Sequence, residues 1–184
     1  MKKQKHEFSE EIINEFKEIG TLKNFKSHEV LINHGEKVNK LYLILEGGMV
    51  LLFIHPKTGA EKAINFFIPS FHPLATIAES YYHGSKSIYQ LKTYTNTTVL
   101  EIDKRDFEYF LENSKNGRFI YDYGLKSLLQ KNTIRTLLTN LTSEEMLVYL
   151  KDNFPQIIQN IPSKYIADFL GITPQWLSKL KHKL

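Results

Sequence analysis

The 184-residue sequence contains no cysteine, which excludes disulfides, thiolate-held zinc, cysteine-ligated iron–sulfur clusters and cysteine nucleophiles. It also lacks any uninterrupted apolar run near the ~20 residues that a membrane-spanning helix requires. The N-terminal lysines are followed directly by acidic residues, a pattern that does not match a secretory signal peptide. We therefore expect a cytoplasmic protein with no membrane partner.

The chain also has only a small excess of one sign of charge, because 24 Lys+Arg against 20 Asp+Glu leave a net charge of +4. The excess is concentrated near the C-terminus. Residues 160–184 hold Lys164, Lys179, Lys181 and Lys183 against Asp168 alone. Such a cluster can attract phosphate, or it can be a solvated helix end whose cations the helix dipole favours. Charge alone leaves both interpretations open.

The hydrophobic pattern changes twice along the chain. Residues 9–19 form a predicted helix with Ser9 as its N-cap and Gly20 at its end. Short apolar runs separated by turn signals then predict strands at 29–32, 40–45, 48–54, 61–67, 87–91 and 97–102. Many short strands at this spacing are typical of a barrel or a double-sheet jelly roll.

After Ile102 the pattern is helical. Asp103 caps a predicted helix to Asn113, and a longer helix is predicted over 117–141, with an apolar stripe that can pack on its own domain or on a second copy. Thr142 and Glu145 form a capping box that starts another helix. The predicted fold class is α+β. A double-stranded β-helix (jelly roll) at 1–116 is followed by a connecting and dimerisation helix at 117–141 and an all-α helix-turn-helix domain at 142–184.

Residues 161–184, IPSKYIADFLGITPQWLSKLKHKL, predict two short helices joined by a tight turn. Gly171 suits a positive φ, Thr173 is a good N-cap, and Pro174 is favoured at a first helical position. The inward positions are Leu177, Leu180 and Leu184. This is the pattern of a helix-turn-helix, although a hairpin that only packs remains the alternative. Trp176 either faces outward or packs on the preceding helix.

The run ADFLGITPQWLSKL at 167–180 resembles the helix-turn-helix of Crp/Fnr-type transcriptional regulators, especially a Bacteroidetes-like branch. The resemblance implies a homodimer that binds pseudo-palindromic DNA, with Gln175 and Lys179 at base-reading positions and with possible contact to RNA polymerase. Gln pairs with adenine edges and Lys with guanine edges, while Lys181, His182 and Lys183 suit phosphates. The predicted DNA-binding residues are Thr173, Gln175, Trp176, Ser178, Lys179, Lys181, His182 and Lys183.

The run GEKVNKLYLILEGGMV at 35–50 is similar to cyclic-nucleotide-binding jelly rolls. That family meets the nucleotide with a Gly-Glu pair and with an Arg followed by a small hydroxyl residue. Residues 66–91 contain neither, and Ser87 falls near the Arg position with Lys86 beside it. We therefore expect that cyclic AMP is not bound tightly. The aromatics of this segment either fill the interior or line a pocket for an unknown effector. The candidate pocket residues are Phe67, Glu79, Tyr81, Lys86, Ser87 and Tyr89.

Two other functions remain open. One is a small-molecule-binding jelly-roll protein with a vestigial helix-turn-helix. The other is a cupin-like metalloenzyme with His72 and His83 as ligands, which the sequence disfavours because no His-x-His pair with a spaced Glu is present. No P-loop, dinucleotide fingerprint or nucleophile–base pattern is found. We therefore predict no catalytic residue, no metal site, no cofactor and no enzyme activity.

Overall fold

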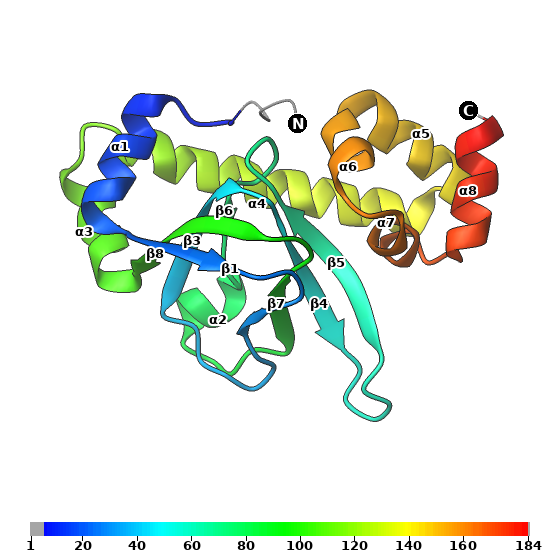
Figure 1. Cartoon of the computed structure of the whole chain (residues 1–184), viewed down its shortest axis with the longest axis horizontal. Coiled ribbons are helices and arrows are strands. Elements are labelled where there is room, and N and C mark those ends of the chain that lie inside the picture. Colours follow the sequence, from blue (N-terminus) through cyan, green and yellow to red (C-terminus); the bar gives the residue numbers. More distant parts are fainter. Residues whose placement is uncertain (1–5, 184) are drawn as a thin grey trace.

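The computed structural model describes residues 6–183, which form a jelly roll, one long helix and a C-terminal helical domain (Figure 1). The predicted α+β fold with an N-terminal jelly roll is confirmed. The strands are β1 Thr21–Phe25, β2 Val30–Ile32, β3 Lys40–Glu46, β4 Met49–Ile54, β5 Glu61–Phe67, β6 Leu74–Ala75, β7 Tyr89–Thr93 and β8 Thr97–Asp103. The helices are α1 Glu10–Ile19, α2 Ala78–His83, α3 Lys104–Asn113, α4 Gly117–Asn140, α5 Ser143–Asn153, α6 Pro155–Asn160, α7 Ser163–Phe169 and α8 Pro174–Lys183.

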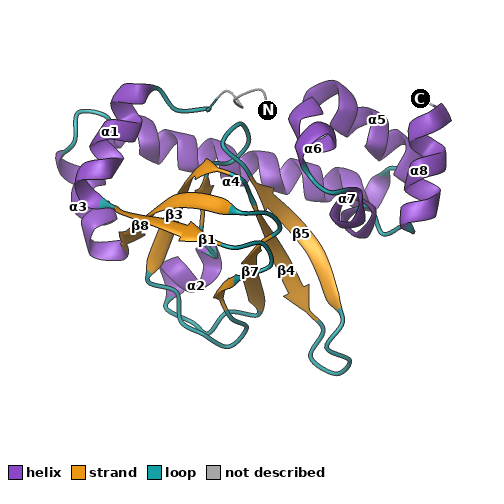
Figure 2. Cartoon of the chain, in the orientation of Figure 1, coloured by secondary structure: helices purple, strands orange, loops and turns teal. Residues whose placement is uncertain are grey.

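The jelly roll consists of two four-stranded antiparallel sheets, ordered β1-β8-β3-β6 and β2-β7-β4-β5 (Figure 2). Strand β3 is buried on both faces, as its uninterrupted apolar sequence predicts, and Leu43 and Ile44 are fully inaccessible to solvent. Helices α1 and α3 supply part of the covering layer. Phe16 of α1 stacks on Phe110 of α3 with 4.9 Å between ring centroids.

Several elements differ from the sequence-based expectation. Strands β1 and β6 and helices α2 and α6 were not predicted, and the strand expected at 87–91 is instead β7, Tyr89–Thr93. Gly20 ends α1 with extended backbone, at φ −115°, and not in the left-handed conformation. A Cβ there would lie 2.9 Å from the carbonyl oxygen of Phe16 and 3.0 Å from Cβ of Leu100. Glycine is therefore needed at this position for close packing against β8.

Helix α4 runs along the jelly roll and continues beside the C-terminal domain (Figure 1). Its inward face includes Ile120 and Ile134, which are 1% and 5% exposed. The opposite face leaves several large apolar side chains in solvent. These are Phe119, Tyr121, Leu125, Leu128 and Leu129, each 45–67% exposed. The expected apolar stripe is therefore divided between a buried face and an unpartnered one.

A second hydrophobic cluster joins the jelly roll to the C-terminal domain. From the jelly roll it includes Val50, Leu52 and Phe66, and from the C-terminal domain it includes Ile166 and Phe169. Because buried apolar area is the main stabilising term in folding, this shared cluster fixes how the two parts sit relative to one another.

Candidate nucleic-acid interface and sensor pocket

The predicted helix-turn-helix is formed by α7 and α8. Gly171 adopts φ +69° after α7. The N–H of Ile172 donates to the carbonyl oxygen of Ala167 at 2.9 Å, and that of Gly171 donates to the carbonyl oxygen of Asp168 at 3.1 Å. These two bonds satisfy carbonyls that the end of α7 leaves open. Thr173 caps α8 by accepting from the N–H of Trp176 at 3.1 Å.

Packing fixes which face of α8 is presented to solvent. Leu177 and Leu180 are 0% and 2% exposed and lie in the same cluster as Ile166 and Ala167 of α7. Of the predicted DNA-binding residues, Lys181 is partly buried. The others are exposed: Thr173, Gln175, Trp176, Ser178, Lys179, His182 and Lys183. Leu184, the third predicted inward leucine, lies outside the described residues.

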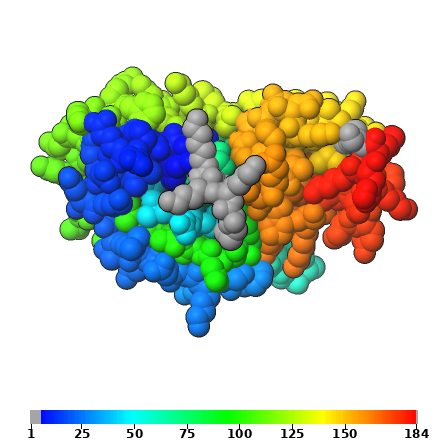
Figure 3. Space-filling model, turned by 45° about the horizontal axis from the view of Figure 1, so that its top comes forward, coloured from blue at the N-terminus to red at the C-terminus, as the bar shows by residue number. Residues whose placement is uncertain are grey.

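Two lysines of α8 are already engaged within the domain. Lys181 donates from Nζ to Oγ of Ser163 at 3.1 Å, and partial burial lowers the pKa of its ammonium group. Lys183 places Nζ 2.6 Å from Oε1 of Glu144 on α5. Trp176 is 48% exposed, so its indole faces outward. Helix α8 forms one end of the molecule, red in Figure 3 (Figure 3).

The helix-turn-helix is docked onto the jelly roll through α7. The rings of Phe169 and Phe66 lie 5.2 Å apart, and those of Tyr165 and Tyr94 lie 6.2 Å apart. Asp168 accepts a hydrogen bond from the backbone N–H of Ala63 on β5, which is the last strand of its sheet. One face of α7 is therefore committed to the jelly roll, and α8 stays exposed beside it.

The predicted sensor-pocket residues are not equally buried. Phe67, Tyr81 and Ser87 are buried, Tyr89 is partly buried, and Glu79 and Lys86 are exposed. Ser87 uses its hydroxyl locally, donating to the carbonyl oxygen and accepting from the N–H of Tyr89, both at 2.9 Å. The Ser87 hydroxyl is therefore engaged by Tyr89 at the start of β7, and Lys86 lies in solvent.

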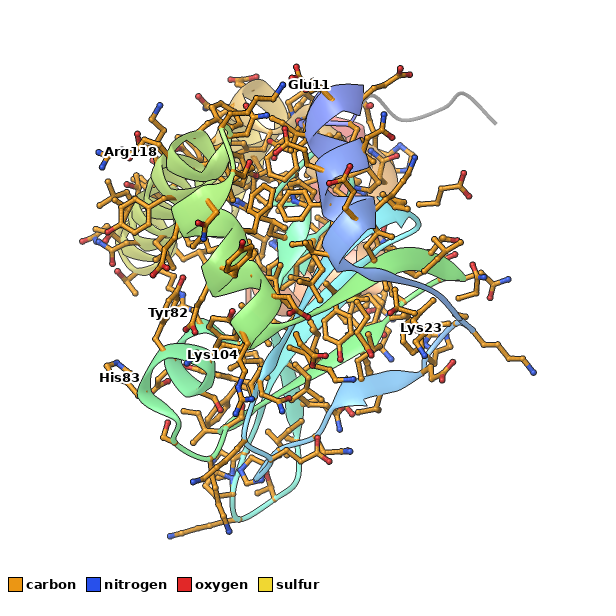
Figure 4. The ribbon with its side chains drawn as sticks, turned by 90° about the vertical axis from the view of Figure 1, so that its left-hand side faces the viewer. Glu11, Lys23, Tyr82, His83, Lys104 and Arg118 are labelled. Carbon is orange, nitrogen blue, oxygen red and sulfur yellow. The ribbon has the colours of Figure 1, made fainter. Side chains whose placement is uncertain are left out.

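Tyr81 is buried among the core residues, and its hydroxyl has no partner among the described residues. Burial raises the pKa of this phenol. Lys104 donates from Nζ to the Tyr81 carbonyl oxygen at 2.6 Å and lies 4.9 Å from its ring centroid. On α2, the helix that carries Tyr81, the next residues Tyr82 and His83 point outward (Figure 4). The aromatic segment therefore fills the interior in part and faces solvent in part.

The two histidines that were considered as metal ligands differ in their environments. His72 is 3% exposed, whereas His83 is exposed on α2. No group of three His, Asp or Glu side chains that could hold a metal ion occurs within residues 6–183. Over the same residues, no helix has the length and apolarity needed to cross a bilayer.

Sequence reasoning missed the polar residues where α4 meets the jelly roll. His72 Nδ1 lies 2.5 Å from Oγ of Ser127, and Lys131 lies with Nζ 4.8 Å from the centroid of the Phe67 ring. A signal was present, because Ile120, Ser127, Lys131 and Ile134 share one helical face. A lysine on an otherwise inward-facing stripe marks a position where a charge is being buried.

Comparison with known proteins is decisive for the jelly roll. The family model described as the cyclic nucleotide-binding domain matches residues 22–114. The chain belongs to the cyclic nucleotide-binding domain family. No curated protein sequence matches the chain.

Solved structures extend the likeness beyond the cyclic nucleotide-binding domain to the whole chain. FixK2 from Bradyrhizobium japonicum has a TM-score of 0.72 at 14% identity, covering 90% of this chain and 84% of that one. The c-di-GMP-responsive global regulator CLP of Xanthomonas campestris has a TM-score of 0.68 at 14% identity, covering 95% and 91%. The Thermus thermophilus catabolite activator protein has a TM-score of 0.57 at 15% identity, covering 97% and 84%. The predicted resemblance to Crp/Fnr-type regulators is thus confirmed for the fold.

Proposed function

We propose that this chain is a DNA-binding transcriptional regulator and that α8 is its recognition helix. One observation carries the proposal: a capped helix, docked by Leu177 and Leu180, presents Gln175, Ser178 and Lys179 to solvent. Helix α8 contains no acidic residue. An exposed helix with polar residues in its first half and basic residues in its second half suits insertion into a major groove.

The exposed side chains divide into two roles. Gln175 and Lys179 reach base edges, where Gln pairs with adenine and Lys contacts guanine as a point charge. The other predicted residues contact the sugar-phosphate backbone of the DNA and position the helix without specifying sequence. They are Thr173, Trp176, Ser178, Lys181, His182 and Lys183. Lys183 must exchange its ion pair with Glu144 for a phosphate. Its contribution to affinity is therefore smaller than that of an unpaired lysine.

Two copies act together in this proposal. The exposed face of α4 carries Tyr121, Leu125 and Leu128, at spacings of four and three residues that form one stripe. Pairing of this stripe with its copy would bury it and would place two recognition helices about one DNA turn apart. The target is then a pseudo-palindrome. The chain acts in the cytoplasm and has no enzymatic role, and contact with RNA polymerase is compatible with this arrangement.

We further propose that the jelly roll does not bind cyclic AMP tightly. Lys86 is exposed, and the Ser87 hydroxyl is engaged by the backbone of Tyr89. A lone exposed lysine supplies charge without the two-pronged hydrogen bonding that an arginine gives to a phosphate. Calorimetric titration with cyclic AMP is expected to show no binding at micromolar concentrations, and micromolar affinity or better would refute this part.

A selection of random oligonucleotides with the purified full-length protein tests the proposal. The expected result is a symmetric motif whose half-sites are separated by about one helical turn. Lys179→Ala should relax sequence preference, whereas Lys183→Ala should weaken all DNA binding modestly and flatten its salt dependence. No DNA binding at low salt would refute the proposal and favour a small-molecule-binding protein with a vestigial helix-turn-helix. Equal effects of the two variants on selected and random DNA would contradict the assigned roles.

A further inference from the structure

The loop of residues 68–73, which joins β5 to β6, braces the C-terminal domain from the jelly-roll side. Phe71 of this loop is 2% exposed and belongs to the hydrophobic cluster that the two parts share. Its ring lies 5.3 Å from the ring of Phe154, between centroids. Phe154 is the residue at which α5 ends and α6 begins. The position of this loop therefore affects how the C-terminal domain is held.

The residue after Phe71 has a strained backbone. His72 adopts φ +51°, a left-handed conformation that residues other than glycine rarely take. Its ring lies 3.9 Å from that of Phe71, and its Nε2 is buried without a partner among the described residues. A conformation of this kind persists only where surrounding contacts hold it. Removing those contacts should let the loop relax and move the Phe71 ring.

Hydrogen bonds from two elements outside the loop hold His72. Glu7, in the segment before α1, accepts through Oε2 from the N–H of His72 at 3.2 Å. On α4, Ser127 places Oγ 2.5 Å from Nδ1 of His72. The same Glu7 oxygen also accepts from the hydroxyl of Tyr123, four residues before Ser127 on α4. One carboxylate oxygen therefore ties the strained residue to α4.

The segment that carries Glu7, residues 6–8, has a fixed position of its own (blue in Figure 1). Phe8 is 4% exposed and lies edge-on to Tyr123, with 4.8 Å between ring centroids. The N–H of Glu7 donates to the carbonyl oxygen of Pro69 at 2.9 Å, in the same loop as His72. Glu7 itself is exposed to solvent. Its carboxylate can therefore be removed by substitution without opening the core.

We propose that Glu7 is a positioning residue for the C-terminal domain, acting through the loop of residues 68–73 and the ring of Phe71. With the Glu7 hydrogen bonds in place, His72 keeps its left-handed conformation and Phe71 stays against Phe154. Without them the loop relaxes, and the C-terminal domain loses one wall of its docking site. Coupling over such a distance is carried by a contiguous chain of packed and hydrogen-bonded groups, and these residues form one.

A consequence for DNA rests on the proposed function. If α8 is the recognition helix, a C-terminal domain held in one pose presents α8 in one orientation, so two copies can engage both half-sites together. Loss of the Glu7 contact widens the range of poses, which lowers affinity for a symmetric site and leaves binding to a single half-site unchanged. The positioning of the domain is independent of DNA.

Native-state hydrogen exchange on the purified full-length protein tests the positioning without DNA. Glu7→Ala should accelerate exchange at the Phe71 and Phe154 amides by about fivefold or more, and it should leave the amide of Leu91 in β7 unchanged. Glu18→Ala, at an exposed acid of α1, is the matched control and should change none of the three. Glu7→Gln keeps an oxygen that can accept both hydrogen bonds, so its exchange rates should stay within about twofold of wild type.

A double-mutant cycle separates positioning through the loop from a local loss of stability. Phe71→Leu removes the ring that contacts Phe154, so adding Glu7→Ala to it should change exchange at residue 154 by less than about twofold. Phe154→Leu removes the partner ring instead, and it replaces Phe71→Leu in the cycle if that variant is altered in its fold. The proposal would be overturned if Glu7→Ala left exchange at residue 154 unchanged or accelerated it equally with and without the Phe71 ring. Equal acceleration at Leu91 would overturn it as well, because the effect would then be global.

DNA affinity is then compared between wild type and Glu7→Ala. We expect a loss of about threefold or more on a symmetric site and no change on a single half-site. The expected exchange pattern in a protein that binds no DNA would refute the proposed function and leave the positioning role of Glu7 standing. Equal affinities of wild type and Glu7→Ala for the symmetric site would refute only the consequence for DNA.

Discussion

The carboxylate of Asp168 on α7 accepts a hydrogen bond from the backbone N–H of Ala63 on β5, with 2.5 Å between Oδ2 and N. Strand β5 lies at the edge of its sheet, so this N–H faces no neighbouring strand. The helix-turn-helix therefore covers an open sheet edge and satisfies it with a charged acceptor, which makes a stronger bond than a neutral one. The same contact ties the pose of α8 to the jelly roll.

Removing this carboxylate should loosen the junction. We expect Asp168→Ala to lower the free energy of unfolding by about 1–2 kcal/mol, because it leaves the Ala63 N–H without a partner. Hydrogen exchange at the Ala63 amide should accelerate correspondingly. Asp152→Ala, at an exposed acid of α5, is the matched control and should leave both measurements unchanged. Unchanged protection of Ala63 in Asp168→Ala would show that the contact does not hold the domain.

Local features of the fold were predictable from the sequence. The turn at Gly171, the N-cap at Thr173 and the capping box of Thr142 with Glu145 depend on residues only a few positions apart, and the structure contains each of them. Their energetics are local, so a sequence window is sufficient to identify them.

Long-range features were not predictable in the same way. In the sequence, Asp168 is merely the one acid in a basic segment, whereas in the structure it bonds a residue 105 positions away. A narrow cavity at the junction likewise brings Asn65 of β5 next to Lys131 and Arg135 of α4. Periodicity indicates that Lys131 faces inward, but only the docking of α4 on the jelly roll determines which groups surround it. The short strand β6 was missed because two residues cannot show an alternating pattern.

His72 should make the protein sensitive to acid. Burial, followed by the nearby charge of Lys131, holds the pKa of its imidazole far below 6.5. Below pH 6.5 the unfolded chain therefore takes up a proton that the folded chain does not. Stability is lost as the pH falls, by about 1.4 kcal/mol per pH unit from this group.

The variant His72→Asn removes this titration and suits the backbone, since residue 72 has φ +51° and asparagine tolerates positive φ. In urea unfolding at pH 7.5, 6.0 and 5.0, the free energy of unfolding of the variant should rise relative to that of wild type as the pH falls. His83→Asn, at an exposed histidine, should follow wild type throughout. A wild-type-to-variant difference that stays constant with pH would show that the folded and unfolded chains protonate His72 equally, and the argument from its lowered pKa would fail.

Lys131 should make the stability of the protein rise as the pH becomes alkaline. Its folded pKa of about 8 lies below its ordinary value of 10.5, so the folded chain holds this proton less tightly than the unfolded chain does. The charged lysine therefore lowers the free energy of unfolding by its full amount below pH 8, and this loss of stability disappears as the pH rises toward 10.5. Lys131→Met should therefore be more stable than wild type at pH 7, by about 2–3 kcal/mol.

In urea unfolding, the difference in the free energy of unfolding between Lys131→Met and wild type should become smaller at pH 8.5 and vanish near pH 10. Lys126→Met controls for loss of a lysine on the same helix, and it should match wild type at every pH. If Lys131→Met were less stable than wild type at pH 7, its ammonium group would have a favourable partner, and the argument for an uncompensated charge would fail.

The exposed stripe of α4 gives the most direct test of pairing between copies. Leu128 is 45% exposed beside Leu125 at 46%, so replacing it changes little within one chain. In a symmetric pair each substitution acts twice. Leu128→Glu removes about 1.5 kcal/mol of apolar burial from each copy and sets two carboxylates near each other. We expect its dimer dissociation constant to rise at least 100-fold in sedimentation velocity, with thermal unfolding of the monomer unchanged.

Leu22→Glu, at a residue of β1 that is 58% exposed, is the control for adding a charge at an exposed leucine elsewhere. It should remain dimeric, and it should bind a symmetric DNA site as wild type does. Leu128→Glu should bind a single half-site as well as wild type does, because α8 is intact. Its DNA affinity should not increase when a second half-site is added. If Leu128→Glu were as dimeric as Leu22→Glu, the copies would pair through another surface, and the half-site spacing deduced from α4 would have to be abandoned.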